Sequence, residues 1–157
     1  MSNQSTWTKL GETRPYWAVL IHDRYRDGQL TEADRRTFFE SGERDVADTL
    51  ATVHRLFDRQ FSPKRALDYG CGVGRLTIPI ARIAAHAVGI DVSAPMVAEA
   101  QRNCDVLAVK NAEFHTVDGF EWTAARESFD FVHSYIVFQH IPPPLGLHLA
   151  SRVLNTL

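Results

Sequence analysis

Three glycines at alternate positions, directly after an apolar run that contains an acid, constrain the fold of this chain most strongly. The segment Ala66–Arg75 reads ALDYGCGVGR and carries Gly70, Gly72 and Gly74. Glycine has no side chain, so its backbone adopts positive φ at no steric cost and a ligand can approach closely. The segment therefore predicts a strand, Arg65–Tyr69, then a tight ligand-binding turn and the start of a helix.

The spacing of these glycines differs from that of turns that bind nicotinamide dinucleotides. Such a turn has the pattern G-x-G-x-x-G, and its third glycine would fall on Arg75 in this chain. The acid two residues before the first glycine, Asp68, also departs from that pattern. A nicotinamide-dependent oxidoreductase is therefore a disfavoured alternative.

Strand-like and helix-like segments alternate after the glycine turn. Further strands are expected at Ala87–Ile90, Ala112–Val117 and Phe129–Tyr135, and helices at about 75–85, 93–104 and 145–157. This alternation predicts an α/β fold in which right-handed crossovers connect the strands of a parallel sheet.

The residues ahead of the sheet have helical character over about 15–60, and we divide the chain into an N-terminal helical region, 1–62, and an α/β core, 63–157. The sequence TEAD at Thr31–Asp34 predicts a capping box that opens a helix. We expect Ser41-Gly42 to interrupt or kink that helix. An apolar stripe at helical period follows over Val46–Phe57.

Ligands of parallel sheets bind beyond the carboxyl ends of the strands, so the residues that follow each expected strand are candidates for a site. Asp91 ends the second strand, where a carboxylate can accept two hydroxyl hydrogen bonds from a ribose. The segment Asp118–Phe120 follows the third strand and offers an acid and a ring to a purine. Beyond the fourth strand, His140 is the nearest candidate for a general base.

Together these segments resemble the class I S-adenosylmethionine (SAM) dependent methyltransferases. Asp68–Gly74 resembles the family's motif I, and Val88–Ser93, reading VGIDVS, resembles motif II. Ser128–Val132 is similar to the family's fourth strand, and Val137–Pro142 to the segment after it. The resemblance covers nearly the whole chain, because Pro15–Leu20 and Phe38–Glu43 also resemble the helical lid of one bacterial branch.

The resemblance implies a Rossmann-like sheet in the strand order 3-2-1-4 with helices on both faces, and SAM as the cofactor. It implies that Asp68 and the glycine-turn backbone hold the amino-acid end of SAM, that Asp91 holds the ribose, and that Asp118 binds the adenine amino group. The implied cofactor-binding residues are Asp68, Gly70, Cys71, Gly72, Gly74, Asp91, Val92, Met96, Asp118, Gly119, Phe120 and Ser134. Tyr16, Trp17 and Tyr135 are candidate substrate or lid contacts, and His140 is the candidate catalytic residue.

The implied reaction is methyl transfer to an unidentified, small-molecule acceptor. It is a direct displacement from a sulfonium, so the protein must mainly position the reactants and exclude water. The chain stops after the helix that follows the fourth strand, so strands five to seven of the family's sheet are absent. Two alternatives therefore stay open: an active enzyme, or a truncated SAM-binding module without methyl-transfer activity. We expect the exposed edge of the fourth strand to be covered by the last helix, by a homodimer partner or by another chain.

Composition limits the remaining classes of partner and compartment. The net charge of −2 over 157 residues gives no electrostatic reason to expect nucleic acid, which is therefore an unlikely partner. No apolar stretch is long enough for a membrane span, and the first residues lack a signal peptide's apolar core, so a cytoplasmic protein is expected. The two cysteines, Cys71 and Cys104, lack metal-ligand spacing and are expected to be free thiols, with no metal site.

Overall fold

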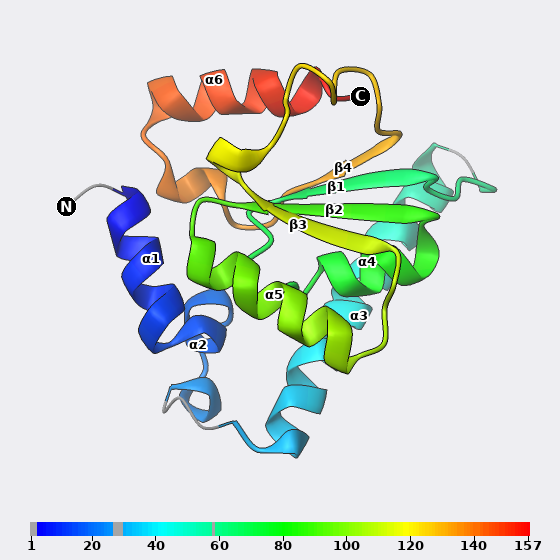
Figure 1. Cartoon of the computed structure of the whole chain (residues 1–157). Helices are drawn as coiled ribbons and strands as arrows, with labels where there is room; N and C mark the ends of the chain where they lie inside the picture. The colour runs from blue at the N-terminus through cyan, green and yellow to red at the C-terminus, as the bar shows by residue number, and fades with distance from the viewer. Residues whose placement is uncertain (1–2, 27–29, 58) are drawn as a thin grey trace.

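The sheet is parallel, and its strands lie in the order β3-β2-β1-β4, as the sequence predicts. A computed structural model describes residues 3–26, 30–57 and 59–157, and over these residues the sheet has four strands. The strands are β1 (Arg65–Tyr69), β2 (His86–Asp91), β3 (Ala112–Thr116) and β4 (Phe131–His133). Since all four run in the same direction, their carboxyl ends meet at one edge (Figure 1).

Side chains of the central strands alternate between two apolar layers, which places helices on both faces of the sheet. Ala66 and Ala87 pack towards α4 (Thr77–Ile83), in a cluster that also contains Val46. On the other face, Leu67 and Val88 pack with residues of α6 (Pro143–Leu154). The helix α5 (Ala94–Val106) covers β2 and β3 on the α4 side, so the predicted three-layer arrangement is confirmed (Figure 1).

The fourth strand is shorter than the sequence predicts. It covers three residues of the expected Phe129–Tyr135, and it pairs with β1 from Ala66↔Phe131 to Asp68↔His133. Just after β4, the Ser134 hydroxyl donates a hydrogen bond to the Tyr69 carbonyl oxygen, 2.9 Å away, and the next residue, Tyr135, is half exposed. Three short 3₁₀ helices lie in the connections of the described chain: η1 (Asp23–Tyr25), η2 (Val117–Gly119) and η3 (Phe138–His140).

Helix α3 (Glu32–Leu56) runs unbroken through Ser41-Gly42, so the expected interruption is wrong. The predicted capping box at its start is confirmed, with the Thr31 side chain accepting from the Asp34 amide. Gly42 does not bend the helix but allows it to pack closely against the residues after the glycine turn. A Cβ atom at this position would lie 2.1 Å from the carbonyl oxygen of Arg75, so only glycine lets α3 approach the turn this closely.

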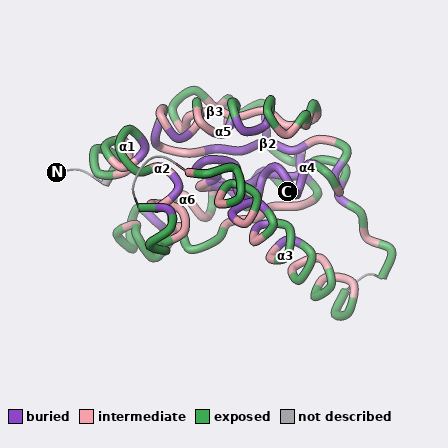
Figure 2. The backbone as a smooth tube through the Cα atoms, turned by 90° about the horizontal axis from the view of Figure 1, so that it is seen from below, coloured by how far each residue is buried: buried purple, intermediate pink, exposed green. Residues whose placement is uncertain are grey.

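The stripe predicted over Val46–Phe57 is buried only at its start. Val46 is in the core, whereas Leu56 and Phe57 are exposed because the end of α3 projects beyond the sheet (Figure 2). The opposite holds for β1, β2 and the glycine turn, where most residues are buried, as Figure 2 shows for β2. No helix among the described residues is long and apolar enough to cross a membrane.

Two α-helices precede α3 among the described residues, and the first of them was not predicted. α1 (Asn3–Thr13) is polar overall and packs against α5, where a Cβ on Gly11 would lie 2.7 Å from Ser93 Oγ. α2 (Pro15–Val19) follows after one residue. Both lie beside the carboxyl edge of the sheet (Figure 1), while the division of the chain at residue 62 stays a prediction.

Replacing Gly42 with alanine should destabilise the protein. The added methyl group meets the Arg75 carbonyl, and overpacking of this kind costs about 1–3 kcal/mol. Gly146→Ala is the matched control, because the Cβ added to this residue of α6 would meet only Ile141, at 3.8 Å. This variant should gain about 0.5–1 kcal/mol from helix propensity. Urea unfolding of both variants measures the two effects. Equal changes in the free energy of unfolding would contradict the close approach of α3.

Candidate active site

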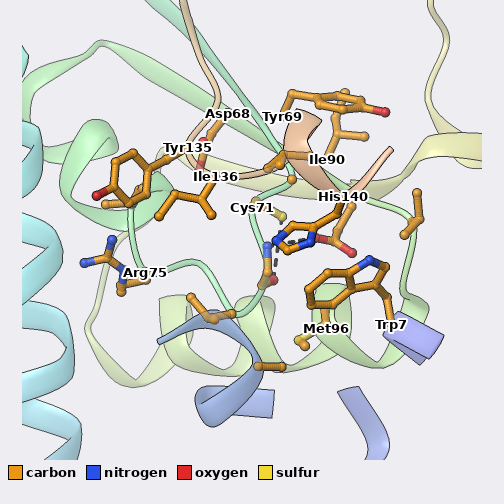
Figure 3. Close-up of a pocket in the computed structure, with 18 of the residues that line it drawn as sticks. Trp7, Asp68, Tyr69, Cys71, Arg75, Ile90, Met96, Tyr135, Ile136 and His140 are labelled. Atoms are coloured by element: carbon orange, nitrogen blue, oxygen red, sulfur yellow. Dashed lines mark hydrogen bonds between the residues drawn. The ribbon is translucent and has the colours of Figure 1, made fainter. Parts of the chain in front are cut away.

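A cavity lies at the carboxyl ends of β1, β2 and β4, where the sequence places the site (Figure 3). Its walls come from the glycine turn, from the ends of the strands, from the segment after β4 and from the N-terminal helices. The lining residues are Trp7, Ala18, Val19, Asp68, Tyr69, Gly70, Cys71, Gly72, Arg75, Leu76, Ile90, Asp91, Val92, Met96, Val117, Tyr135, Ile136, Val137, His140 and Ile141.

The turn after β1 has the conformation that its glycines predict. Gly70, Gly72 and Gly74 have φ values of 82°, 52° and 84°, in the left-handed region that favours glycine. The amides of Gly70 and Cys71 both donate to the Ile90 carbonyl oxygen, at 2.7 and 3.0 Å, and tie the turn to the end of β2. The turn is thus held in place by the neighbouring strand.

Asp91, the last residue of β2, also joins the glycine turn to the end of that strand through its side chain. Its Oδ2 atom accepts from the Gly72 amide at 2.9 Å, and its Oδ1 atom from the Ser93 amide at 2.9 Å. Desolvation raises the pKa of this carboxyl above its ordinary value, and the two amides partly offset that effect. The carboxylate is therefore oriented before any ligand arrives and retains lone pairs towards the cavity.

Asp68 lies deeper, at the end of β1, with both carboxylate oxygens engaged. Thr77 Oγ1 donates to its Oδ2 atom at 2.6 Å, and His133 Nδ1 lies 3.1 Å from its Oδ1 atom. The residue is buried and still borders the cavity. The Cys71 thiol beside it is also buried, and desolvation, followed by the charge of Asp91, raises the pKa of that thiol well above its ordinary value. Cys71 is therefore a protonated wall residue and not a thiolate nucleophile.

The N-terminal helices, which are the expected lid, form one wall of the cavity. Val19 lies against the glycine turn, where a Cβ on Gly72 would be 2.5 Å from its Cγ2 atom. Trp7 of α1 meets the His140 ring edge to face, with ring centroids 5.3 Å apart. Figure 3 shows these two rings side by side at the cavity. Their contact joins α1 to the segment after β4.

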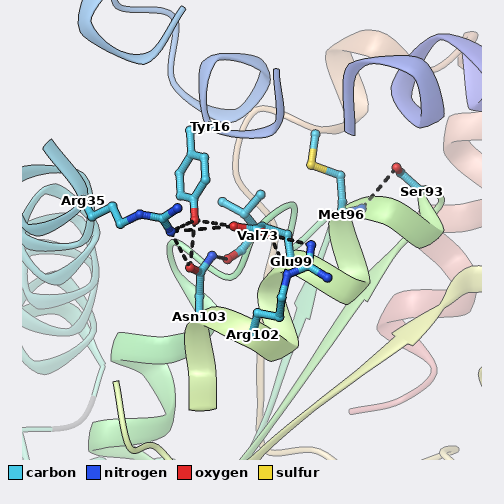
Figure 4. A network of polar contacts seen from close by, with 8 residues as sticks. All are labelled: Tyr16, Arg35, Val73, Ser93, Met96, Glu99, Arg102 and Asn103. Carbon is cyan, nitrogen blue, oxygen red and sulfur yellow. Dashed lines mark hydrogen bonds and ion pairs between the residues drawn. The ribbon is translucent and has the colours of Figure 1, made fainter. Parts of the chain in front are cut away.

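A polar network fixes the lid to the core (Figure 4). The buried hydroxyl of Tyr16 lies 2.5 Å from Glu99 Oε1 and 2.8 Å from Asn103 Oδ1, and Arg35 donates to it at 2.5 Å. Asn103 in turn donates to the Val73 carbonyl oxygen within the glycine turn, at 3.0 Å. Burial, and then Glu99, raise the pKa of Tyr16 well above its ordinary value, so the hydroxyl keeps its proton. The network joins α2, α3 and α5 to the turn.

The cavity gathers most of the predicted site residues from segments far apart in the chain. Those that line it are Asp68, Gly70, Cys71, Gly72, Asp91, Val92, Met96, Tyr135 and His140. Those that do not are Gly74, Asp118, Gly119, Phe120, Ser134, Tyr16 and Trp17. Phe120 packs edge to face on Trp122, with centroids 4.9 Å apart, and Asp118 and Gly119 are exposed. Of the segment after β3, it is Val117 that borders the cavity.

Several lining residues were not predicted. Tyr69 and Arg75 flank the glycine turn, and Val137 packs so closely that a Cβ on Gly70 would lie 2.2 Å from its Cγ2 atom. Arg75 is 3% exposed, and its Nη1 atom pairs with Asp45 of α3 at 2.8 Å. Tyr69 and Arg75 could have been predicted as lining residues, because they stand directly beside the glycines in the sequence. No local pattern indicated Trp7. Val19 was indicated only as part of the lid-like segment Pro15–Leu20, because its contact with the cavity depends on how that segment docks.

A comparison with protein families identifies the family to which the chain belongs. Residues 66–156 match the family described as "Methyltransferase domain", which covers more than half of the chain. The chain belongs to this methyltransferase family. The predicted family is thereby confirmed, and its Rossmann-like sheet is the one described above.

Solved structures of methyltransferases share this fold. Magnesium protoporphyrin IX methyltransferase from Synechocystis PCC 6803 superimposes with a TM-score of 0.63 and is 25% identical, over 98% of this chain and 71% of that one. One crystal structure of that enzyme has bound SAM, and another has bound S-adenosylhomocysteine. The prediction of SAM as the family's cofactor is confirmed by these structures.

Curated relatives correct the predicted acceptor. The 23S rRNA (uracil(1939)-C(5))-methyltransferase of Hahella chejuensis is 31% identical over 112 residues, or 71% of this chain, and its Nitrosococcus oceani counterpart is 42% identical over 101 residues. This chain spans 24% and 21% of their lengths. The expectation of a small-molecule acceptor, with nucleic acid unlikely, is wrong on this comparison. A net charge summed over the chain does not report which surface meets a partner.

The contact between the lid and the glycine turn predicts a coupled pair of substitutions. Gly72→Ala places a methyl group against Val19 and strains a residue at positive φ, which should lower the free energy of unfolding by about 1–3 kcal/mol. Val19→Ala removes the atoms in the way, so in that background Gly72→Ala should cost less. A double-mutant cycle measured by urea unfolding gives the coupling energy. Strictly additive changes would show that the lid does not rest on the turn.

Proposed function

We propose that this chain binds SAM in the cavity and forms the SAM-binding part of a methyltransferase that acts on RNA. SAM binding is supported mainly by the position of the Asp91 carboxylate next to the glycine turn. The two oriented carboxylate oxygens can accept hydrogen bonds from a ligand, and the glycines let that ligand approach the backbone closely. Asp91 would hold the ribose hydroxyls. Val92 and Met96, which lie beyond it on the cavity wall, would contact the adenine.

The backbone of the glycine turn and Asp68 line the cavity and would hold the amino-acid end of SAM. Ser134 does not line the cavity, but it lies next to Tyr135, which does, and its carbonyl oxygen would accept from the amine. Asp118, Gly119 and Phe120 follow β3 outside the cavity wall, so their proposed contact with the adenine requires movement of the η2 segment.

RNA as the acceptor is supported by the curated relatives and by one feature of the cavity edge. Tyr135 and Ile136 border the cavity and are 50% and 54% exposed. An exposed aromatic ring is a stacking surface for an unpaired base, and the Arg75 guanidinium lies 5.9 Å from this ring. The base would enter beside Tyr135 and meet the methyl group there.

The chain's own residues would act mainly by placement. Methyl transfer from a sulfonium yields a neutral thioether, so the leaving group needs no proton. Bound SAM would supply the electrophilic methyl group. The lid residues Trp7 and Val19 would exclude water, and His140 would accept a proton from an acceptor that arrives protonated.

Asp91→Ala should weaken cofactor binding by about 1–3 kcal/mol, because the ribose loses its charged acceptor. Calorimetric titration with S-adenosylhomocysteine measures the change. Asp105→Ala is the matched control, since Asp105 is an exposed carboxylate near the end of α5 that pairs with Gln101. Equal affinity of the Asp91→Ala and Asp105→Ala proteins would reject the ribose assignment.

Methyl transfer to RNA is tested with SAM that carries a labelled methyl group and with total bacterial RNA freed of protein. We expect label in the RNA fraction that ribonuclease releases. Tyr135→Ala should reduce incorporation at least tenfold, whereas its affinity for S-adenosylhomocysteine should change little, because Tyr135 would meet the base. Binding of the cofactor without any label in RNA would reject RNA as the acceptor of this chain.

A further inference from the structure

A buried carboxylate–imidazole pair lies at the end of β1, next to the proposed site for the amino-acid end of the cofactor. Asp68 is 2% exposed, and the side chain of His133 is 12% exposed. The two residues are register partners on β1 and β4, and His133 Nδ1 lies 3.1 Å from Asp68 Oδ1. A carboxylate can only accept, so Nδ1 carries the hydrogen of this bond and Nε2 is the atom that gains or loses a proton.

The charges around the imidazole leave Asp68 as its principal partner. The charged groups of the described residues that act on His133 are Asp68 from β1, Arg75 from the glycine turn and Asp45 from α3. Arg75 and Asp45 pair with each other at 2.8 Å, so their effects on the imidazole largely cancel. Burial lowers the pKa of His133, but the hydrogen bond and charge of Asp68 outweigh it and raise that pKa above its ordinary value.

We propose that His133 is a positioning residue that sets how strongly Asp68 attracts the ammonium group of the bound cofactor. This inference rests on the proposed function, because it needs the amino-acid end of SAM at Asp68. Neutral His133 donates a hydrogen bond through Nδ1 and holds the Asp68 carboxylate in place without neutralising the negative charge of that carboxylate. Protonated His133 neutralises that charge. The ammonium and the imidazolium compete for one carboxylate, so binding of the cofactor releases the Nε2 proton to solvent.

The test must separate His133 from the other titratable groups at the cavity. Asp91 and His140 both border it, and desolvation raises the pKa of Asp91. Methylthioadenosine is the discriminating probe, because it keeps the adenine and the ribose hydroxyls but lacks the ammonium and carboxylate. Any effect of Asp91 or His140 on the nucleoside part appears with both ligands, whereas an effect through Asp68 appears only with S-adenosylhomocysteine.

The experiment is calorimetric titration of the full chain with both ligands from about pH 5.5 to about pH 8, where histidine changes its charge. Three proteins are compared: the unmodified chain, His133→Asn and His86→Asn. The His133→Asn side chain keeps a hydrogen-bond donor near the position of Nδ1 but does not titrate. His86 is the matched control, since it faces Glu113 at 3.3 Å at the opposite end of the sheet.

We expect the unmodified chain to bind S-adenosylhomocysteine roughly fivefold more tightly, or better, at the upper pH than at the lower one, relative to methylthioadenosine. His86→Asn should behave in the same way. His133→Asn should show no such difference at any pH, with an affinity near that of the unmodified chain at the upper pH. An identical pH dependence in His133→Asn and the unmodified chain would overturn the inference.

Proton release provides a second measurement that needs no variant, should His133→Asn fail to fold. Titrations of the unmodified chain near pH 7, in two buffers of different ionisation enthalpy, give the number of protons released on binding. S-adenosylhomocysteine should release more protons than methylthioadenosine, and equal release would overturn the inference. Failure of the unmodified chain to bind S-adenosylhomocysteine at any pH would overturn the proposed function and this inference together.

Discussion

The hydrogen bond from the Gly72 amide to the Asp91 carboxylate is the interaction on which the architecture of the site depends. It joins the turn after β1 to the end of β2, and the Gly70 and Cys71 amides reinforce that junction through the Ile90 carbonyl. A turn with three residues at positive φ has few other ways to satisfy its amides. The same bonds that stabilise the turn therefore orient the carboxylate at the floor of the cavity.

The lid depends on this turn in two ways. Val19 packs on the face of Gly72, where any side chain would intrude, and the Tyr16 network reaches the Val73 carbonyl through Asn103. Gly42 lets α3 approach Arg75 from below. Three helices, α2, α3 and α5, thus meet at this loop, and the glycines at two of the contact points allow the close approach. Val73 of the loop packs in the same buried cluster as the aromatic residues around Phe38.

Local patterns predicted the strands, the capping box of α3 and the glycine turn, because each rests on interactions between residues close in the chain. The prediction failed where distant contacts decide. Glycine in a helix is unfavourable by propensity, so Ser41-Gly42 was expected to interrupt α3. The helix nevertheless continues, and Gly42 lets it pack closely against the Arg75 carbonyl. α1 is polar and was missed, since it becomes a helix against α5. The acceptor class was also mistaken, because charge summed over a chain carries no information about position.

The sequence by itself determined the α/β class, the strand order through its resemblance to a family, and the site at the carboxyl ends of the strands. These features depend on periodicity and on the steric freedom of glycine, which are properties of short segments. Only the tertiary structure decided which side chains reach the cavity. It turned Phe120 away onto Trp122, brought Trp7 to His140, and set His133 opposite Asp68 through the register of an edge strand. Such pairings join residues up to 133 positions apart, and the packing of whole elements fixes them.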